Sequence, residues 1–313
     1  MIDSFDLTIS FDKAEYLNPQ LYMMIDTLKD NIPKDTILHV TTNRPENDPV
    51  IKYIVDTVPT YLYYKEPFKD LKSRCQYMFH CFEIDTAKEW VIKTEIDVLF
   101  LRKLREFNQI LEKDIDVAIQ PENRRIYDDN VLETRLWRQI YRAMDIKMPE
   151  LMLPYVENQE FGRPLLATGV VAVKSKHLDK INERWVNLTK ICERWIDYGI
   201  HPNEFAFTGL IFDEEWDFKL YNRKYNFNPI GHFRKGMYPS VKLVDDCKLP
   251  SETIVFDYHR PQWLYHVSRF NPEIRNIIQR NLEHIPKNWW ETDIEKFFEE
   301  EVLTNVWKDF YRK

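Results

Sequence analysis

The order of apolar and polar positions predicts alternating strands and helices over the first 120 residues. In residues 6–11 apolar and polar side chains alternate, which is typical of a half-buried strand. Residues 19–30 have helical spacing, with Pro19 in the first turn, where proline is tolerated. The same patterns predict further strands at 36–42, 60–64, 90–100 and 116–120, and helices at 49–58, 70–82 and 102–113. Such alternation favours a parallel sheet with helices on its faces.

The second half of the chain has a different texture. Its patterns predict strands at 165–175 and 253–260, and helices at 130–144, 176–199 and 203–215. From about residue 270 the chain is helical and rich in Trp and Phe, which indicates a helical extension that packs on the body. The polar segment 121–130 follows a strand end, where lids commonly lie, and we expect a mobile flap there.

Composition narrows the class of protein. With 44% hydrophobic and 30% charged residues among 313, the chain is globular, and its net charge of −7 argues against nonspecific nucleic-acid binding. No run approaches the roughly 18 apolar residues of a transmembrane segment. The first residues are acidic and polar, unlike a signal peptide. Four cysteines without zinc or redox spacing indicate a reducing compartment, so we expect a cytoplasmic protein. With only 6 glycines, no Gly-rich phosphate loop is present.

Two acids interrupt the apolar run WVIKTEIDVLF, residues 90–100. On an uninterrupted strand Lys93, Glu95 and Asp97 share one face, because side chains alternate. One interpretation is a solvated edge strand, or a strand that ends near Thr94 in a polar turn. The other is a metal site, because carboxylates at the carboxyl end of a strand can hold a hard divalent ion. Both interpretations stay open on these residues alone.

The surrounding sequence resembles a known family. A basic segment, an apolar strand and then acid-x-acid-Val-Leu-Phe resemble the DXD region of GT-A-fold glycosyltransferases, in particular the glycogenin-like and galactosyltransferase families. Here the first acid is Glu95, so the motif is E-x-D. A longer side chain reaches a metal directly or through water. ISFDKAEYLNP, residues 9–19, resembles the first strand and following loop, where these enzymes hold the nucleobase.

Four later segments resemble the family in the same order. LLATGVVAVKS resembles "FN-x-GVMLI", with Ala167 where Asn is usual, and HPNEFAFTGLIFD resembles the "DQ-x-x-LN" helix start. RKYNFNP resembles the "YN" element, and IVFDYHRPQWL resembles the "H-x-x-G-x-x-KPW" segment. Together the motifs cover roughly residues 5 to 265.

The resemblance implies an α/β fold of the GT-A type, with a Rossmann-like, mixed but mostly parallel sheet flanked by helices. Residues 1–268 would form the catalytic domain and 269–313 the helical extension. The implied activity is metal-dependent transfer of a sugar from a nucleotide-sugar donor, UDP-sugar above all. The acceptor would be a carbohydrate, a protein or a lipid-linked glycan. Mn²⁺ or Mg²⁺ is the implied cofactor, and no nucleic-acid partner is expected.

The resemblance also implies site residues. Asp97 would bind the metal, Glu95 the metal or the ribose, and His259 would complete the metal shell unless Asp257 takes that place. Lys72 and Arg74, on the predicted helix before the acidic strand, could pair with phosphate. Four residues would cradle the base and ribose: Ser10, Phe11, Asp12 and Tyr16. For Phe11, which continues the apolar face of its strand, packing in the core is the favoured alternative.

Asn203 and Glu204 stand where the family has Asp-Gln, and they are the candidate catalytic pair. As a general base, Glu204 would deprotonate an acceptor hydroxyl. The alternative is an acid that complements the helix dipole, and an enzyme that retains configuration needs no such base. Two other functions compete. A non-catalytic sugar- or nucleotide-binding module is favoured by Glu95 and Ala167, whereas a nucleotidyltransferase normally has the Gly-rich loop that this chain lacks.

Overall fold

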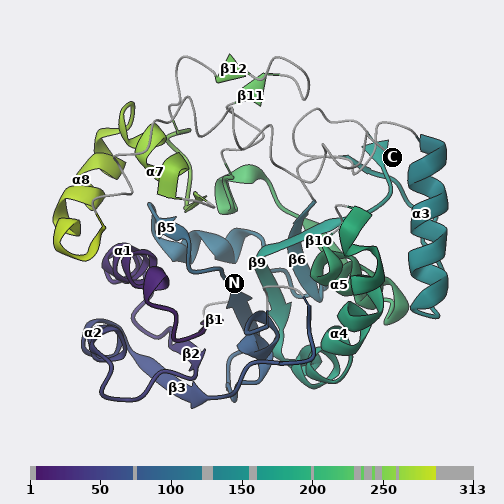
Figure 1. Ribbon diagram of the computed structural model, residues 1–313, viewed down its shortest axis with the longest axis horizontal. Helices are drawn as coiled ribbons and strands as arrows, with labels where there is room; N and C mark the ends of the chain where they lie inside the picture. Colours follow the sequence, from purple (N-terminus) through teal and green to yellow (C-terminus); the bar gives the residue numbers. More distant parts are fainter. Residues whose placement is uncertain are drawn as a thin grey trace.

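The computed structural model describes residues 5–72, 76–121, 130–154, 161–198, 201–228, 234–235, 242–243, 249–258 and 261–286. Within these residues a seven-stranded sheet forms the centre, in the order β10-β6-β9-β4-β1-β2-β3 (Figure 1). Its strands are β1 (Phe5–Phe11), β2 (Leu38–Thr42), β3 (Thr60–Tyr64), β4 (Trp90–Lys93), β6 (Val117–Pro121), β9 (Leu166–Lys174) and β10 (Phe218–Leu220).

One strand reverses the direction of an otherwise parallel sheet. β9 runs antiparallel between β4 and β6, while the other neighbouring pairs are parallel. The start of β9 therefore lies beside the carboxyl ends of β4 and β6, where ligands bind in open α/β sheets. The predicted α/β class with a mixed, mostly parallel sheet is confirmed.

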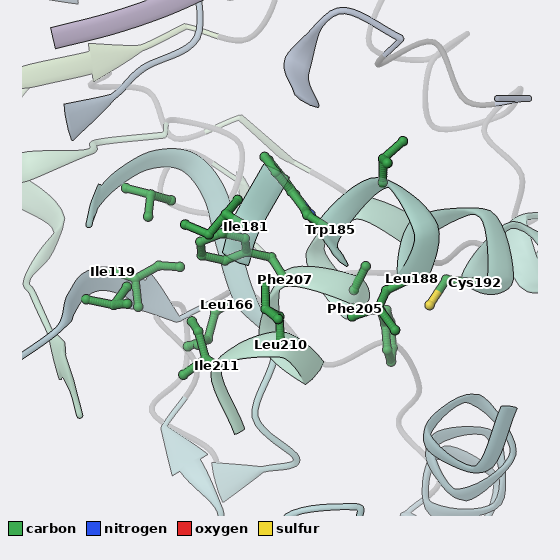
Figure 2. Packing of buried hydrophobic residues seen from close by; sticks show 14 of the residues in the cluster. Ile119, Leu166, Ile181, Trp185, Leu188, Cys192, Phe205, Phe207, Leu210 and Ile211 are labelled. Atoms are coloured by element: carbon green, nitrogen blue, oxygen red, sulfur yellow. The ribbon is translucent and has the colours of Figure 1, made fainter. Parts of the chain in front are cut away.

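Helices cover both faces of the sheet. The helices are α1 (Asn18–Leu28), α2 (Pro49–Thr57), α3 (Asn130–Ala143), α4 (Leu178–Cys192), α5 (Pro202–Asp213), α7 (Pro261–Ser268) and α8 (Pro272–Arg280). Alternation along β4 shows the division, because Val91 joins the core beneath α3, α4 and α5, whereas Trp90 and Ile92 join the core beneath α1 and α2. In Figure 2 apolar side chains of α4 and α5 face each other; the rings of Trp185 and Phe207 meet edge to face at 5.0 Å.

A smaller sheet lies beside the main one. β5 (Val98–Phe100) pairs antiparallel with β13 (Val255–Asp257). Leu99 and Phe256 of this pair pack with α7 and α8 in a third core, whereas Val98, Phe100 and Val255 join the core beneath α1 and α2. The remaining described strands form two short pairs: β7 (Leu153–Pro154) with β8 (Phe161–Gly162), and β11 (Arg234–Lys235) with β12 (Lys242–Leu243). The later part of the predicted extension, residues 287–313, lies outside the described residues.

The single strand predicted for residues 90–100 is wrong, and the alternative of a strand that ends near Thr94 in a turn is confirmed. The structure has two strands in different sheets, β4 and β5, separated by a bend at residues 94–97. β4 ends because its neighbours change: after Lys93 the Thr94 N–H still donates to the Thr8 carbonyl, but Val98 pairs with Asp257 instead of with the main sheet. The two acids consequently lie in a turn between sheets and not on a strand face.

Two predicted helices are also wrong. Residues 102–113 form only a short 3₁₀ helix, Leu104–Gln109, in which the two buried side chains, Leu104 and Phe107, are three residues apart. The described part of 70–82 contains the 3₁₀ helix Met78–Phe82, in which every residue is buried. Its carbonyl groups accept hydrogen bonds from threonines of β1 and β2, so tertiary contacts dominate over local helical spacing.

The long helix predicted at 176–199 is shorter than expected, because α4 ends at Cys192 and a 3₁₀ helix, Glu193–Tyr198, follows it. The helices predicted at 130–144 and 203–215 are confirmed as α3 and α5. Among the described residues, the model has no helix with both the length and the apolar character that crossing a membrane requires.

Candidate active site

The turn between β4 and β5 places two acids at the centre of the molecule. The Glu95 N–H donates to the Gly169 carbonyl at 3.1 Å, which fixes the turn against the start of β9. On the other side the Asp97 carbonyl accepts a hydrogen bond from the Tyr258 N–H at 3.1 Å. Backbone contacts from two sheets therefore hold the E-x-D motif in place.

A third acid joins the pair. Oxygen atoms of Glu95, Asp97 and Asp257 all lie within 4.8 Å of one another, and we call these three residues the acidic cluster. Asp257 comes from β13, whose pairing with Val98 sets it next to the turn. It is 5% exposed, while the other two acids are half-buried. Of the two candidates for the third position, Asp257 lies in the cluster, and His259 lies outside the described residues.

The cluster favours protonation of one of its members. Burial and the neighbouring charge of Glu95 together raise the pKa of Asp97 to about 7, while Lys93 acts in the opposite direction. Like charges this close repel, so a bound cation relieves an unfavourable interaction that a proton would otherwise relieve. The arrangement has the electrostatics of a cation site.

Lys93 is the residue whose role the sequence does not reveal. Its ammonium donates to the Thr168 carbonyl at 2.5 Å and lies 3.5 Å from Glu95 Oε1. The sequence pattern places Lys93 on the face of the two acids, but it gives no indication that the ammonium is buried among them. Lysine on an exposed edge strand would show the same pattern.

Small and polar residues border the cluster. A Cβ on Gly169 would stand 3.2 Å from Asn226 Nδ2, 3.6 Å from Asp257 Oδ2 and 3.8 Å from Glu95 Oε2, so a glycine leaves space there. The side-chain oxygen of Asn226 is buried and has no hydrogen-bond partner among the residues that the structure describes. Asn228 Nδ2 lies 3.4 Å from Asp257 Oδ2, within hydrogen-bond reach.

These features fit a hard divalent ion. Carboxylate oxygens are the ligands that Mn²⁺ and Mg²⁺ prefer, and three of them converge here. The buried amide oxygen of Asn226 is a further oxygen donor of the appropriate kind. Glu95, Asp97 and Asp257 would hold the ion, which when bound would supply positive charge for an anionic group.

The loop after β1 is built around a buried arginine. Arg44 is 1% exposed, and its guanidinium donates to the carbonyl groups of Asp12 and Ala14 at 3.0 and 2.7 Å. A third hydrogen bond reaches Asn18 Oδ1 at 2.7 Å, and the guanidinium lies 5.6 Å from the centre of the Phe11 ring. Arg44 therefore fixes residues 12–14 directly, although nothing in the sequence singles it out.

The four residues predicted to cradle a nucleoside have different exposures. Phe11 is buried in the core, as its alternative interpretation expects, and Ser10 at the end of β1 is half-buried. Asp12 is half-buried and accepts a hydrogen bond from the Ala14 N–H at 2.8 Å. Tyr16 is 72% exposed, so its ring is available to a ligand.

The candidate catalytic pair lies in the first turn of α5. Asn203 is buried, and its amide donates to the Thr168 hydroxyl at 2.8 Å. Because the Thr168 carbonyl accepts from Lys93, one residue of β9 connects α5 to the acidic cluster. Glu204 is half-buried beside Asn203. These contacts tie Asn203 to the strand that borders the acidic cluster.

Of the two predicted phosphate-binding cations, only Lys72 is among the described residues, and it is not on a helix. Lys72 is exposed in an irregular segment before the 3₁₀ helix Met78–Phe82, which contradicts the predicted helical placement. Arg74 lies outside the described residues, as does most of the predicted flap, residues 122–129.

Comparison with known proteins gives a fold. No protein-family model and no curated protein sequence matches the chain. A solved structure of an active-site Gln-to-Glu mutant of LgtC matches it with a TM-score of 0.55 at 15% identity, over 91% of this chain and 98% of that one. The galactosyltransferase LgtC in complex with donor and acceptor sugar analogues matches with a TM-score of 0.51 at 14% identity, over 91% of this chain and 98% of that one. The glycosyltransferase GlyE of Streptococcus pneumoniae TIGR4 matches with a TM-score of 0.52 at 10% identity, over 95% of this chain and 63% of that one.

The chain has the GT-A fold. The predicted resemblance to GT-A glycosyltransferases is thereby confirmed at the level of fold. In this GT-A fold the acidic cluster lies at the carboxyl end of β4, where the E-x-D motif is predicted to lie. Fold alone does not specify chemistry, so the activity has to be argued from the site.

Proposed function

We propose that the protein is a metal-dependent glycosyltransferase that takes a sugar from a nucleotide-sugar donor, a UDP-sugar. The observation that carries the proposal is the acidic cluster, three converging carboxylates at a strand end of a GT-A fold. Glu95 and Asp97 are paired by the E-x-D turn, and Asp257 joins them from the second sheet. A purely structural turn gains nothing from three acids that repel one another.

The proposed roles follow from position. Mn²⁺ or Mg²⁺ on the acidic cluster would hold the diphosphate of the donor and offset the charge of the departing nucleoside diphosphate. Ser10, Asp12 and Tyr16, at the end of β1 and in the following loop, would contact the nucleoside. Arg44 would keep that loop in shape, because it binds two of its carbonyl groups.

Glu204 is proposed to contact the acceptor or the donor sugar. It lies in the first turn of α5, and Asn203 beside it is tied to Thr168 of β9. If Glu204 is a general base, Glu204→Gln lowers transfer by on the order of 10²–10⁴ while nucleotide binding survives. Near-native transfer by the variant would exclude the base and favour a retaining mechanism.

The experiment is a panel of nucleotide sugars, each incubated with the full chain with and without Mn²⁺, with release of nucleoside diphosphate as the readout. Asp97→Asn is the test variant. Asp56→Asn, which changes an exposed acid on α2, is its matched control. We expect metal-dependent release by the wild type and the control, and none by Asp97→Asn. Release that is independent of both metal and Asp97 would refute the proposal.

A second candidate is a non-catalytic module that binds a nucleotide or sugar. Ala167 favours it, because the resembled strand has an amide there and the half-buried methyl group of Ala167 cannot hydrogen-bond a substrate. The same panel separates the two functions. Metal-dependent binding of UDP without turnover of any donor would support the module and refute the transferase.

A further inference from the structure

A buried positive charge lies within the acidic cluster. Lys93, the last residue of β4, is 2% exposed. Its ammonium is held from two sides, by the Thr168 carbonyl at 2.5 Å and by Glu95 Oε1 at 3.5 Å. A buried ammonium is unfavourable unless it is paired, so both contacts are needed to keep it there.

Strand pairing does not explain this lysine. Lys93 stands opposite Val171 of β9 in the backbone register, and the preceding residues of β4 are apolar and fully buried. An apolar side chain would continue the strand without an ionic group to desolvate. What Lys93 adds at this position is its charge, next to three carboxylates.

The charges of the site can be counted. With all groups ionised, three carboxylates contribute −3 and Lys93 contributes +1, which leaves −2. A divalent ion brings that total to zero. Without the lysine the ion-loaded site would keep a charge of −1 and would repel the diphosphate of a donor.

We propose that Lys93 makes the ion-loaded site accept an anionic diphosphate. The proposal rests on the proposed function and deepens it. Lys93 does not touch the ligand: it acts through its field and through its hold on Glu95. The charge of Lys93 weakens binding of the metal cation and strengthens binding of the anionic diphosphate. Removing that charge should therefore change the two affinities in opposite directions.

The test is calorimetric titration of the full chain, first with Mn²⁺ alone and then with UDP at saturating Mn²⁺. Lys93→Met and Lys93→Gln remove the charge, and the Gln amide can still donate to the Thr168 carbonyl. Lys93→Arg keeps the charge. For the neutral variants we expect Mn²⁺ to bind at least about fivefold more tightly and UDP at least about fivefold more weakly. Lys93→Arg should retain the affinity for UDP.

The matched control is Lys174→Met. Lys174 is also a buried lysine, and its ammonium also donates to a backbone carbonyl, that of Lys113. It lies at the carboxyl end of β9, away from Thr168 and the acidic cluster. This variant should leave both affinities unchanged, which separates a field effect at the site from the loss of any buried lysine.

Each outcome decides. Opposite shifts in the neutral variants support the proposal. Parallel losses of both affinities, or unchanged affinities, overturn it and leave Lys93 a packing residue. If Lys93→Met fails to fold, Lys93→Gln carries the same test. A wild type that binds neither Mn²⁺ nor UDP refutes the proposed function itself, a result distinct from failure of the Lys93 proposal.

Discussion

An acid lies at each end of the central sheet, and the two acids have opposite kinds of neighbours. At the amino ends of β1 and β2, Asp6 belongs to a hydrogen-bonded network with His39, Tyr63 and Thr86, which we call the amino-end network. At the carboxyl end of β4, Asp97 belongs to the acidic cluster. Asp6 is buried and Asp97 is half-buried, and the pKa values of the two carboxyl groups move in opposite directions.

Partners explain the difference. Burial alone would raise the pKa of Asp6, but hydrogen bonds from His39, Thr86 and the Ile37 N–H outweigh it, and the pKa lies below its usual value. Burial also raises the pKa of Asp97, and there the main neighbour is another acid, Glu95. An acid that serves the fold has its lone pairs satisfied by the protein, whereas the acid at the candidate site is left for an external partner.

The largest expected effect is the loss of the amino-end network. Asp6→Asn keeps the shape of the side chain but presents an amide to groups that donate to Asp6, so it should lower the free energy of unfolding at pH 7 by about 3 kcal/mol. Denaturant unfolding measures this. Because the pKa of Asp6 is lowered on folding, its contribution is present above about pH 4 and fades as the pH falls further. An unchanged midpoint for the variant at pH 7 would contradict the comparison.

Mn²⁺ should stabilise the protein through the acidic cluster at the carboxyl end of β4, and not through the amino-end network. Mn²⁺ at about 100 times its dissociation constant should raise the free energy of unfolding by about 2.7 kcal/mol, through mass action on the native state. Thermal unfolding at pH 8 with and without Mn²⁺ checks this. Asp97→Asn should show no such rise, while Asp56→Asn should behave as the wild type does. A rise that survives in Asp97→Asn would place the ion elsewhere.

Without metal, Asp97→Asn should stabilise the protein. The pKa of Asp97 rises to about 7 on folding, so ionising this group at higher pH favours the unfolded chain. The variant should therefore gain about 1–2 kcal/mol above pH 7, a figure reduced because the group is only half-buried. The gain should shrink as the pH falls and vanish below about pH 4. Unfolding midpoints measured in chelator across this range give the profile, and a pH-independent difference would contradict it.

Gly169→Ala should have the smallest effect on stability. The new methyl group would lie 3.2 Å from Asn226 Nδ2, so that amide must shift slightly, and we expect a change within about 1 kcal/mol. Because the methyl group fills the space between Asn226 and the acidic cluster, affinity for Mn²⁺ should fall all the same. Calorimetry beside thermal unfolding separates the two quantities, and unchanged affinity would show that the space is not used.

Regular apolar spacing predicted most of the fold from sequence. Strands β1 and β2 and helices α1, α2 and α5 were predicted from alternation, a short apolar run or helical spacing. Of these elements α2 buries one face, whereas β1, β2 and α5 are buried almost throughout. The 3₁₀ helix Met78–Phe82 did not follow, since its bonds to Thr8 and Thr41 come from distant segments. A strand end near Thr94 was one of the interpretations that the sequence left open, but the pairing of Val98 with Asp257 in a second sheet is not contained in any local pattern.

The candidate site was predictable only in part. The E-x-D motif and its place at a strand end could be predicted, and Asp257 was one of two candidates, with His259, for the third metal ligand. The burial of Lys93 and the hold of Arg44 on the β1 loop could not, because each depends on contacts across the fold. The helical placement of Lys72 failed together with the helix that was meant to carry it.

The wide separation of the site residues along the chain also has a consequence for the rate of folding. The candidate site draws on Lys93 and the E-x-D turn, on Gly169 of β9, on Asn226, and on Asp257, which is 164 positions beyond Lys93. Contacts so distant along the chain form slowly, because closing the long intervening loops costs conformational entropy before the contacts stabilise the chain. During synthesis the first half of the sheet emerges well before β9 and β13. We therefore expect the candidate site to be among the last parts of the molecule to assemble.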